Sequence, residues 1–401
     1  WLVLCSLFFY SWWNPVYLWL LVGSMLVNYL LSKAMLAKGG KNYLLFTGIT
    51  WNLGLLGYFK YANFFVENLH LATDLSFSNE AIVLPLAISF FTFQQITFLV
   101  DTHRGRSQEP SFLHYALFVT FFPQLIAGPI VHHREMLPQF ARGKLQGLKA
   151  SNLSIGITIF AIGLFKKVVL ADGIAVYATS VFAAAESGSS VTFFEAWGGV
   201  LSYSLQLYFD FSGYSDMAIG LARMFGIRLP LNFNSPYRAT SIIDFWRRWH
   251  MTLSRFLRDY LYLPLGGNRK GPMRRTNNLM ITMLLGGLWH GANWTFVLWG
   301  GLHGIYLIIN HAWRMIVPIL ATNSSRLRKL LGWTTTVLAV VVAWVPFRAE
   351  SMEGTIQILT AMVGANGFAL PETYFTHFNK IFALGDFLAS LGWRFENVEH
   401  F

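Results

Sequence analysis

The chain has 401 residues, of which 54% are hydrophobic, 17% aromatic and only 12% charged, about half the charged share of an average soluble domain. This composition does not suit a soluble globular protein. The net charge of +11 comes from 30 Lys and Arg residues against 19 Asp and Glu residues, and in so apolar a chain it indicates basic cytoplasmic loops rather than nucleic-acid binding. The single cysteine, Cys5, excludes a disulfide framework or a metal site built from several thiols within one chain.

Apolar runs recur along nearly the whole sequence. Residues 1–31 hold two apolar stretches, parted by Asn14 and Pro15, with Trp and Tyr residues crowded at the break as at a membrane interface. Four further runs approach the length that spans about 30 Å of hydrocarbon as a helix: residues 81–100, 152–171, 295–309 and 333–345. The sequence therefore predicts an all-α polytopic membrane protein, with one integral-membrane domain over residues 1–401.

Residues 112–131 are flanked by cations on both sides, so one full crossing would violate the bias of cationic loops towards the cytoplasm. The centre of this segment contains Pro123 and Pro129, which interrupt a helix. We expect a re-entrant hairpin that is buried in protein. An ordinary kinked crossing is the alternative.

Residues 223–275 are strongly basic and contain an amphipathic helical pattern. Spacings of three and four place six apolar residues on one stripe of a helix: Trp246, Trp249, Leu253, Phe256, Tyr260 and Leu263. The other surface would carry Arg247, Arg248, His250, Ser254, Arg255 and Arg258. Ser241 with Asp244 gives an N-terminal capping signature, and Pro264 supplies a stop. We expect a cytoplasmic interfacial or re-entrant helix, whose arginines bind either a substrate or anionic lipid headgroups.

Residues 277–313 are again bracketed by cations, which predicts that both ends of this segment lie on one side of the membrane. His290 is 13 residues beyond Asn277, and 13 residues of helix extend about 20 Å, which is short of the far surface. We therefore expect His290 at membrane depth. The surrounding stretch, 286–293, contains three glycines, which permit close packing or a broken helix.

His290 is the first candidate for chemistry, because ionisable groups inside a bilayer are costly and usually functional. Imidazole transfers protons near neutral pH, and burial favours its neutral, basic form. A histidine that stabilises a helix interface through a hydrogen bond is the alternative. His303 lies among further glycines, and we interpret it as a packing residue.

His250 would share its helix face with arginines, and such a surface suits an anionic acyl donor such as a nucleotide-containing thioester. A solvated helix face with an incidental histidine is the alternative. No metal site is predicted, because no carboxylate lies within two turns of His290 or His303. Residues 208–216 place two carboxylates and two serines at the expected end of a crossing, where they either orient a substrate hydroxyl or cap a helix.

Several separate motifs follow one another in the second half of the chain: Phe233-Asn-Ser-Pro-Tyr-Arg238, Asp244-Phe-Trp-Arg-Arg-Trp-His-Met-Thr-Leu-Ser254, Arg258-Asp-Tyr260, Tyr262-Leu-Pro-Leu-Gly-Gly-Asn-Arg269 and Gly286-Gly-Leu-Trp-His-Gly-Ala-Asn-Trp294. In this combination the chain resembles a membrane-bound O-acyltransferase (MBOAT) of the alginate O-acetyltransferase type. The resemblance covers nearly all 401 residues. It places the motif-bearing catalytic core at residues 232–304.

The resemblance implies a ring of tilted transmembrane helices around a thin membrane centre, with re-entrant segments and cytoplasmic amphipathic helices. It implies that His290 is the catalytic base and that His250 is the second histidine of the reaction centre. The candidate substrate-binding residues are Arg247, Arg248, Ser254, Arg258, Trp289 and Asn293. Compared with the family, we expect the first membrane helix to be incomplete here and further helices to follow the last residue.

We therefore expect a multi-pass enzyme of the bacterial inner membrane that transfers an acetyl group from a cytoplasmic thioester, either acetyl-CoA or another acyl thioester. The acceptor would be a surface or exported polysaccharide of the alginate, cellulose or peptidoglycan type, reached through a periplasmic acetyltransferase partner. Membrane lipid is an expected partner, whereas a bound cofactor, a metal and nucleic acid are not. The alternatives are D-alanyl transfer to teichoic acid from a carrier protein, and a proton-coupled transporter, which predicts an internal symmetry that the sequence lacks.

Overall fold

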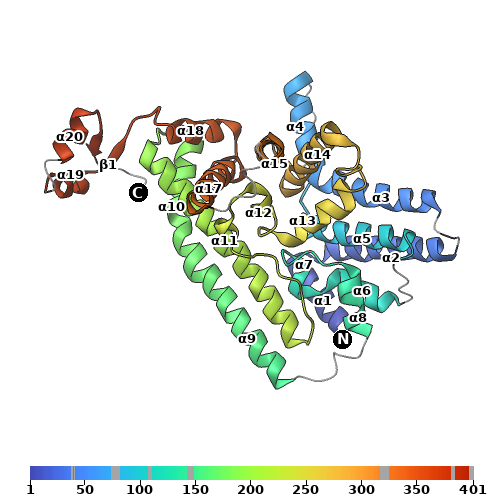
Figure 1. Ribbon diagram of the computed structural model, residues 1–401. Helices are drawn as coiled ribbons and strands as arrows, with labels where there is room; N and C mark the ends of the chain where they lie inside the picture. Colours follow the sequence, from blue (N-terminus) through green and yellow to red (C-terminus); the bar gives the residue numbers. More distant parts are fainter. Residues whose placement is uncertain are drawn as a thin grey trace. The chain divides into compact units, whose positions relative to one another are not determined.

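The computed structural model describes residues 1–37, 39, 41–73, 82–106, 111–141, 149–316, 325–380 and 384–396. These residues fold almost entirely into helices (Figure 1). Within this described part, the strands are β1 (Ala369–Pro371) and β2 (Arg394–Glu396), which pair in parallel. The predicted all-α class is confirmed.

The chain forms two compact units, each assembled from several segments. Unit 1 consists of Trp1–Leu164, Tyr214–Phe233 and His250–Leu261. Unit 2 consists of Phe165–Gly213, Asn234–Trp249 and Tyr262–Phe401, as far as these are described. The single integral-membrane domain expected over residues 1–401 stays a prediction.

Unit 1 is a set of helices around an aromatic and aliphatic core. Its elements are α1 (Leu2–Trp13), α2 (Val16–Ala37), α3 (Asn42–Leu56), the π-helical η1 (Gly57–Tyr61), α4 (Ala62–Thr73), α5 (Ile88–His103), α6 (Phe112–Thr120), α7 (Phe122–Leu125), α8 (His133–Ala141), α13 (Met251–Leu257) and nearly all of α9 (Ala150–Phe165). The two apolar stretches predicted at the N-terminus are confirmed as α1 and α2, which meet at Asn14 and Pro15.

Buried polar side chains connect α2, α3 and α5 inside unit 1. The Asn52 side-chain amide donates to Asn28 Oδ1 at 2.6 Å, and the Ser24 hydroxyl donates to Gln95 Oε1 at 2.8 Å. All four side chains are buried. Where water is absent, such hydrogen bonds hold helices together that hydrophobic packing alone does not orient.

Residues 112–131 are interrupted, as the two prolines predicted. α6 ends at Thr120, Phe121 adopts an extended ψ of 103°, and α7 has only 4 residues. The chain then returns through α8, which contacts α6. Because the 9 residues of α6 extend about 14 Å, this helix is too short to cross a bilayer. The break and the return favour the predicted hairpin over a kinked crossing.

Unit 2 contains η2 (Lys166–Ala171), α10 (Asp172–Glu186), η3 (Pro236–Arg238), α12 (Ile242–Trp246), α14 (Gly271–His290), α15 (Trp294–Ile316), α17 (Arg326–Arg348), α18 (Met352–Met362), α19 (Glu372–Asn379), α20 (Leu384–Ser390) and both strands. The long helix α11 (Phe193–Met224) begins in unit 2 and ends in unit 1, and the π-helical η4 (Arg258–Tyr262) begins in unit 1. An aromatic cluster occupies the interior of unit 2, where Trp299 and Trp344 are almost fully buried.

Three helices in the described part of the chain are long and apolar enough to cross a membrane: Val16–Ala37, Ala150–Glu186 and Arg326–Arg348. The second and third contain the predicted runs 152–171 and 333–345. The run 295–309 lies inside α15, and α5 covers most of the run 81–100, of which residue 81 lies outside the described residues.

The expected position of residues 208–216 at the end of a crossing is wrong, because this segment lies within α11. The Asp210 carboxylate accepts an ion pair from Lys167 Nζ at 2.6 Å, and the same ammonium contacts Asp172 at 2.7 Å. A carboxylate in mid-helix does not cap a helix terminus. The capping interpretation of Asp210 is therefore excluded, whereas a role in orienting a substrate hydroxyl is not tested.

Candidate active site

His290 lies at the tip of a helical hairpin in unit 2. α14 and α15 run antiparallel and are joined by the short connection 291–293 (Figure 1). Glycines allow the two helices to approach closely, because a Cβ at Gly287 would collide with the carbonyl oxygen of Phe296, and one at Gly300 with that of Met283. The close packing that the glycines predicted is confirmed.

The two ends of this hairpin lie beside each other, since the Arg275 guanidinium contacts Met315 Sδ at 3.5 Å. That both ends lie on one side of the membrane stays a prediction. α14 starts at Gly271, six residues before the Asn277 used as the membrane boundary in the sequence argument, and His290 is its last residue. A helix of 20 residues extends about 30 Å, which is enough to span hydrocarbon. Helix length therefore does not by itself fix the depth of His290, which stays a prediction.

Aromatic rings surround the His290 imidazole. Trp289, Trp299 and Phe347 present their rings roughly perpendicular to it at centroid distances of 4.9, 5.0 and 5.1 Å. Phe296 lies nearly parallel at 6.5 Å. The half-buried imidazole thus has apolar rings on several of its sides.

Asn293 and Trp289, two of the predicted substrate-binding residues, form part of this hairpin tip. Asn293 Oδ1 accepts from the backbone N–H of Thr295 at 3.0 Å, which caps the start of α15. Its amide also donates to the carbonyl oxygen of Glu350 at 2.8 Å. Asn293 thus fixes the connection beside His290, and its contact with a substrate stays a prediction, as does that of Trp289.

His303 is fully buried in the aromatic interior of unit 2. Its Nδ1 accepts from the indole N–H of Trp246 at 3.3 Å, and its ring lies 4.9 Å from that of Trp299. These contacts are those of a packing residue, which agrees with the interpretation from sequence.

The continuous amphipathic helix predicted around residues 246–263 is wrong. α12 ends at Trp246, α13 starts at Met251, and His250 between them has a left-handed backbone with φ of +39°. The capping signature is confirmed, since the Ser241 hydroxyl accepts from the Asp244 backbone N–H at 3.2 Å. A left-handed non-glycine residue ends a helix, so the apolar periodicity is divided between two separate helices.

The break at His250 also divides the predicted arginine surface. Arg247 and Arg248 belong to unit 2, whereas Ser254 and Arg258 belong to unit 1. The Arg248 guanidinium is paired with Asp244 at 2.9 Å, and Arg247 is exposed. The expectation of one continuous cationic helix face is therefore wrong.

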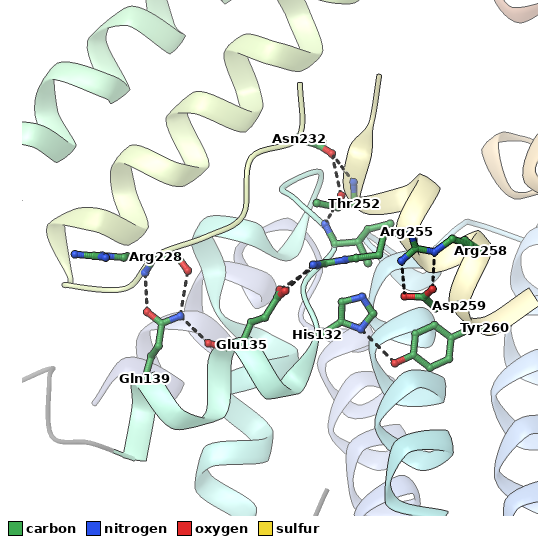
Figure 2. A network of polar contacts seen from close by, with 11 residues as sticks. His132, Glu135, Gln139, Arg228, Asn232, Thr252, Arg255, Arg258, Asp259 and Tyr260 are labelled. Atoms are coloured by element: carbon green, nitrogen blue, oxygen red, sulfur yellow. Dashed lines mark hydrogen bonds and ion pairs between the residues drawn. The ribbon is translucent and has the colours of Figure 1, made fainter. Parts of the chain in front are cut away.

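Unit 1 also pairs its arginines with carboxylates (Figure 2). Arg255 makes a bidentate ion pair with Glu135 of α8, with N···O distances of 2.6 and 3.0 Å. Arg258 makes a bidentate ion pair with the neighbouring Asp259, at 2.7 and 3.2 Å. Glu135 is 120 residues away in sequence, so helical periodicity gave no sign of this partner. The paired guanidinium groups offer fewer donors to an anionic substrate.

Asn232 is the functional-site neighbour that sequence reasoning missed. Its Oδ1 lies 3.0 Å from His250 Nδ1. The same oxygen accepts from the Thr252 hydroxyl at 2.9 Å, and Figure 2 shows this hydrogen bond. The Thr252 oxygen in turn accepts from the backbone N–H of Ile130 at 3.0 Å. His250 is thus buried in a hydrogen-bonded environment that joins three distant segments of unit 1.

A second buried polar chain in unit 1 runs from Asp101 to His132. The Tyr260 hydroxyl donates to Asp101 Oδ2 at 2.8 Å. The same hydroxyl lies 3.2 Å from His132 Nδ1 (Figure 2). His133, whose Nδ1 is 3.7 Å from the same Asp101 oxygen, is neutral at physiological pH because burial lowers its pKa to about 4. Within the described ranges, no group of three or more His, Cys, Asp or Glu side chains converges as metal ligands would.

The family model of the membrane-bound O-acyltransferases, MBOAT, matches residues 36–345. The chain belongs to this family. Both His250 and His290 lie within the matched residues. The protein is therefore an acyltransferase of the membrane, and family membership favours acyl transfer over the alternative of a proton-coupled transporter.

Individual relatives of this MBOAT chain are bacterial proteins. It is 48% identical over 400 residues to a peptidoglycan O-acetyltransferase of Helicobacter pylori, which covers 92% of this chain and 74% of the relative. It is 43% identical over 382 residues to a probable alginate O-acetylase of Pseudomonas putida, with coverages of 92% and 76%. A teichoic acid D-alanyltransferase of Bacillus subtilis is 29% identical over 65% of each chain. The O-acetylating relatives are thus more similar than the D-alanylating one.

Proposed function

We propose that this MBOAT protein transfers an acetyl group from a cytoplasmic thioester to hydroxyl groups of a polysaccharide at the outer side of the bacterial cytoplasmic membrane. The acceptor is of the peptidoglycan or alginate type, the substrates named for relatives at 48% and 43% identity. Transfer to the polymer proceeds through a periplasmic acetyltransferase partner. The relative named for D-alanyl transfer, at 29% identity, makes a carrier-protein donor the second candidate.

The position of His290 carries the proposed chemistry. The imidazole ends a helix at a hairpin tip, and the aromatic rings of Trp299 and Phe347 exclude water from two of its sides. A poorly solvated neutral imidazole is suited to accept a proton from an acceptor hydroxyl. His290 is accordingly the catalytic base of the proposal.

The reaction is an acyl transfer in which atoms and charges balance. His290 takes the hydroxyl proton, and the resulting alkoxide attacks the thioester carbonyl carbon. The C–S bond then breaks, and the departing thiolate takes up the proton from the imidazolium. His250 or backbone N–H groups around the glycines stabilise the oxyanion of the intermediate. A relay through an acetyl group carried on His290 is the alternative route.

The donor in this proposal is acetyl-CoA or another acyl thioester, and its phosphates are attracted by arginines. Arg247 and Arg258 are both exposed, but Arg258, like Arg248, is engaged by a carboxylate. A guanidinium group that is not paired with a carboxylate has more N–H donors available for an incoming phosphate. Arg247 is therefore the leading candidate for attracting the acyl donor. Ser254 and Trp289 are candidates for contacting the bound substrate.

His290→Ala and His290→Gln test this proposal. Each should reduce acetylation of the surface polymer by about 10²- to 10⁴-fold, the usual contribution of a general base, while the protein stays in the membrane. Polymer acetate is quantified after alkaline release, and the amount of membrane protein is measured in the same cells. Retention of more than about a tenth of the activity would contradict a general base at this position.

A further inference from the structure

The Asn232 side chain makes contacts that determine the protonation pattern of the neighbouring His250. Asn232 is 1% exposed and lies in the segment that follows α11. Its Oδ1 faces three possible donors in unit 1: His250 Nδ1 at 3.0 Å, the Thr252 hydroxyl at 2.9 Å and the Thr252 backbone N–H at 3.3 Å. Its Nδ2 faces Ser215 Oγ at 3.3 Å.

The backbone contact settles which way the Asn232 amide points. Oxygen and nitrogen of an amide are otherwise hard to distinguish, and their assignment follows from the hydrogen-bond network. A backbone N–H only donates, so the atom that faces the Thr252 N–H must be the oxygen. The Ser215 hydroxyl both donates and accepts, and it is compatible with the amide nitrogen on the other side.

This orientation fixes the tautomer of the histidine. An amide oxygen only accepts, so the neutral ring must carry its hydrogen on Nδ1, where it donates to Asn232. The lone pair of the neutral imidazole is then on Nε2. In this form the Nε2 atom accepts a proton, and it donates to an oxyanion only after it has been protonated.

Asn232 also holds the strained backbone of His250. The Asn232 carbonyl oxygen accepts from the backbone N–H of Met251 at 2.9 Å, directly after the left-handed His250. Residues in this conformation are costly and persist where surrounding contacts over-determine them. One residue thus fixes both the main chain and the ring of the histidine.

We propose that Asn232 is the positioning residue of His250, which it holds in the Nδ1–H tautomer with Nε2 ready to accept a proton. This inference rests on the proposed function, in which His250 takes part in acyl transfer. It assigns the neutral His250 a proton-accepting role and leaves oxyanion stabilisation to a protonated His250 or to backbone N–H groups.

Asn232→Ala is the first test, in the intact membrane-embedded protein. Turnover per folded molecule should fall about 10- to 100-fold, the scale seen when the hydrogen-bond partner that orients a metal-bound histidine is lost, with little change in KM for the donor. Asn52→Ala is the matched control, because Asn52 is likewise a buried, hydrogen-bonded asparagine but contacts Asn28 rather than a candidate histidine, and it should retain normal turnover per folded molecule. A fall confined to protein amount, with normal turnover per molecule, would overturn the proposal.

A double-mutant cycle separates this proposal from the proposed role of His250 itself. If Asn232 acts through the histidine, Asn232→Ala should have no further effect on turnover in a His250→Ala background. An equal loss in both backgrounds would mean that Asn232 acts elsewhere and would overturn the positioning role. Unchanged turnover in His250→Ala alone would instead contradict the proposed function of His250.

Asn232→Asp provides a variant that keeps the acceptor. It should recover turnover relative to Asn232→Ala, because its carboxylate still accepts from Nδ1–H. A carboxylate beside an imidazole favours the protonated ring and raises its pKa, so the pH at which turnover rises should move upward. Turnover and pH profile identical to those of Asn232→Ala would contradict the tautomer argument, which requires an accepting oxygen at this position.

Discussion

The two candidate histidines are held in opposite ways. The ring of His290 is bordered by Trp289, Phe296 and Trp299, which belong to its own hairpin, together with Phe347 of α17. His250 instead depends on a polar contact with Asn232, 18 residues earlier in the chain. Aromatic contacts limit solvation without choosing a tautomer, whereas a hydrogen bond to an amide oxygen chooses one. The contacts of Asn232 therefore fix where the neutral His250 ring carries its proton.

This difference explains which parts of the site followed from sequence. The hairpin of α14 and α15 was predicted because its determinants are local: apolar runs, flanking cations and the glycines at 287 and 300. The interruption of residues 112–131 was predicted for a similar reason, since Pro123 acts on its own helix. Local chemistry is readable from one sequence.

The break at His250 was not predicted because its cause is distant in the chain. The spacing of apolar residues by three and four fits a helix, and it continues on both sides of the break. What stops the helix is a left-handed residue whose neighbours bond to Asn232 and, through Thr252, to Ile130. Propensity is a weak prior that tertiary hydrogen bonds override. The ion pair of Arg255 with Glu135 escaped prediction for the same reason.

The largest effect that sharpens the comparison is expected from His250→Ala. Loss of a group that accepts a proton in the reaction typically lowers turnover about 10²- to 10⁴-fold, and the protein should still reach the membrane. His303→Ala should act mainly through protein amount, because His303 is fully buried among aromatic rings. Both variants are compared by acetyl transfer per folded molecule. Equal losses of turnover at equal expression would contradict this ranking.

Gly291→Ala tests whether the aromatic surroundings position His290. A Cβ at Gly291 would collide with the Phe296 ring, which itself packs edge-on against Phe347 at 5.2 Å. Such overpacking typically costs about 1–3 kcal/mol, and here it should displace the rings around the imidazole, so that turnover falls along with thermal stability in detergent.

Gly301→Ala is the matched control within the same hairpin. Its added Cβ would lie 3.7 Å from Leu284 Cδ2, which is ordinary van der Waals contact. We expect near-normal turnover and stability. If Gly291→Ala behaved like this control, the rings would not be needed to hold His290, and the contrast between an aromatic and a polar setting would lose its functional meaning.

The smallest effects are expected from the arginines, where the comparison extends from the histidines to their charged neighbours. Arg247→Gln should raise the KM for acetyl-CoA about two- to five-fold, the scale of an exposed charge pair, because Arg247 is exposed in the break before His250. Arg258→Gln should change KM less, since that guanidinium is already engaged by Asp259 through two hydrogen bonds.

Added salt should weaken donor binding in the unmodified protein and have less effect in Arg247→Gln, because screening acts on the charge that the substitution removes. Equal KM values for the two variants, with lower membrane insertion in both, would assign the arginines to lipid headgroups. Activity with an acylated carrier protein and none with acetyl-CoA would move the donor to the carrier-dependent type, and the exposed Arg247 would then face an acidic protein surface rather than a nucleotide phosphate.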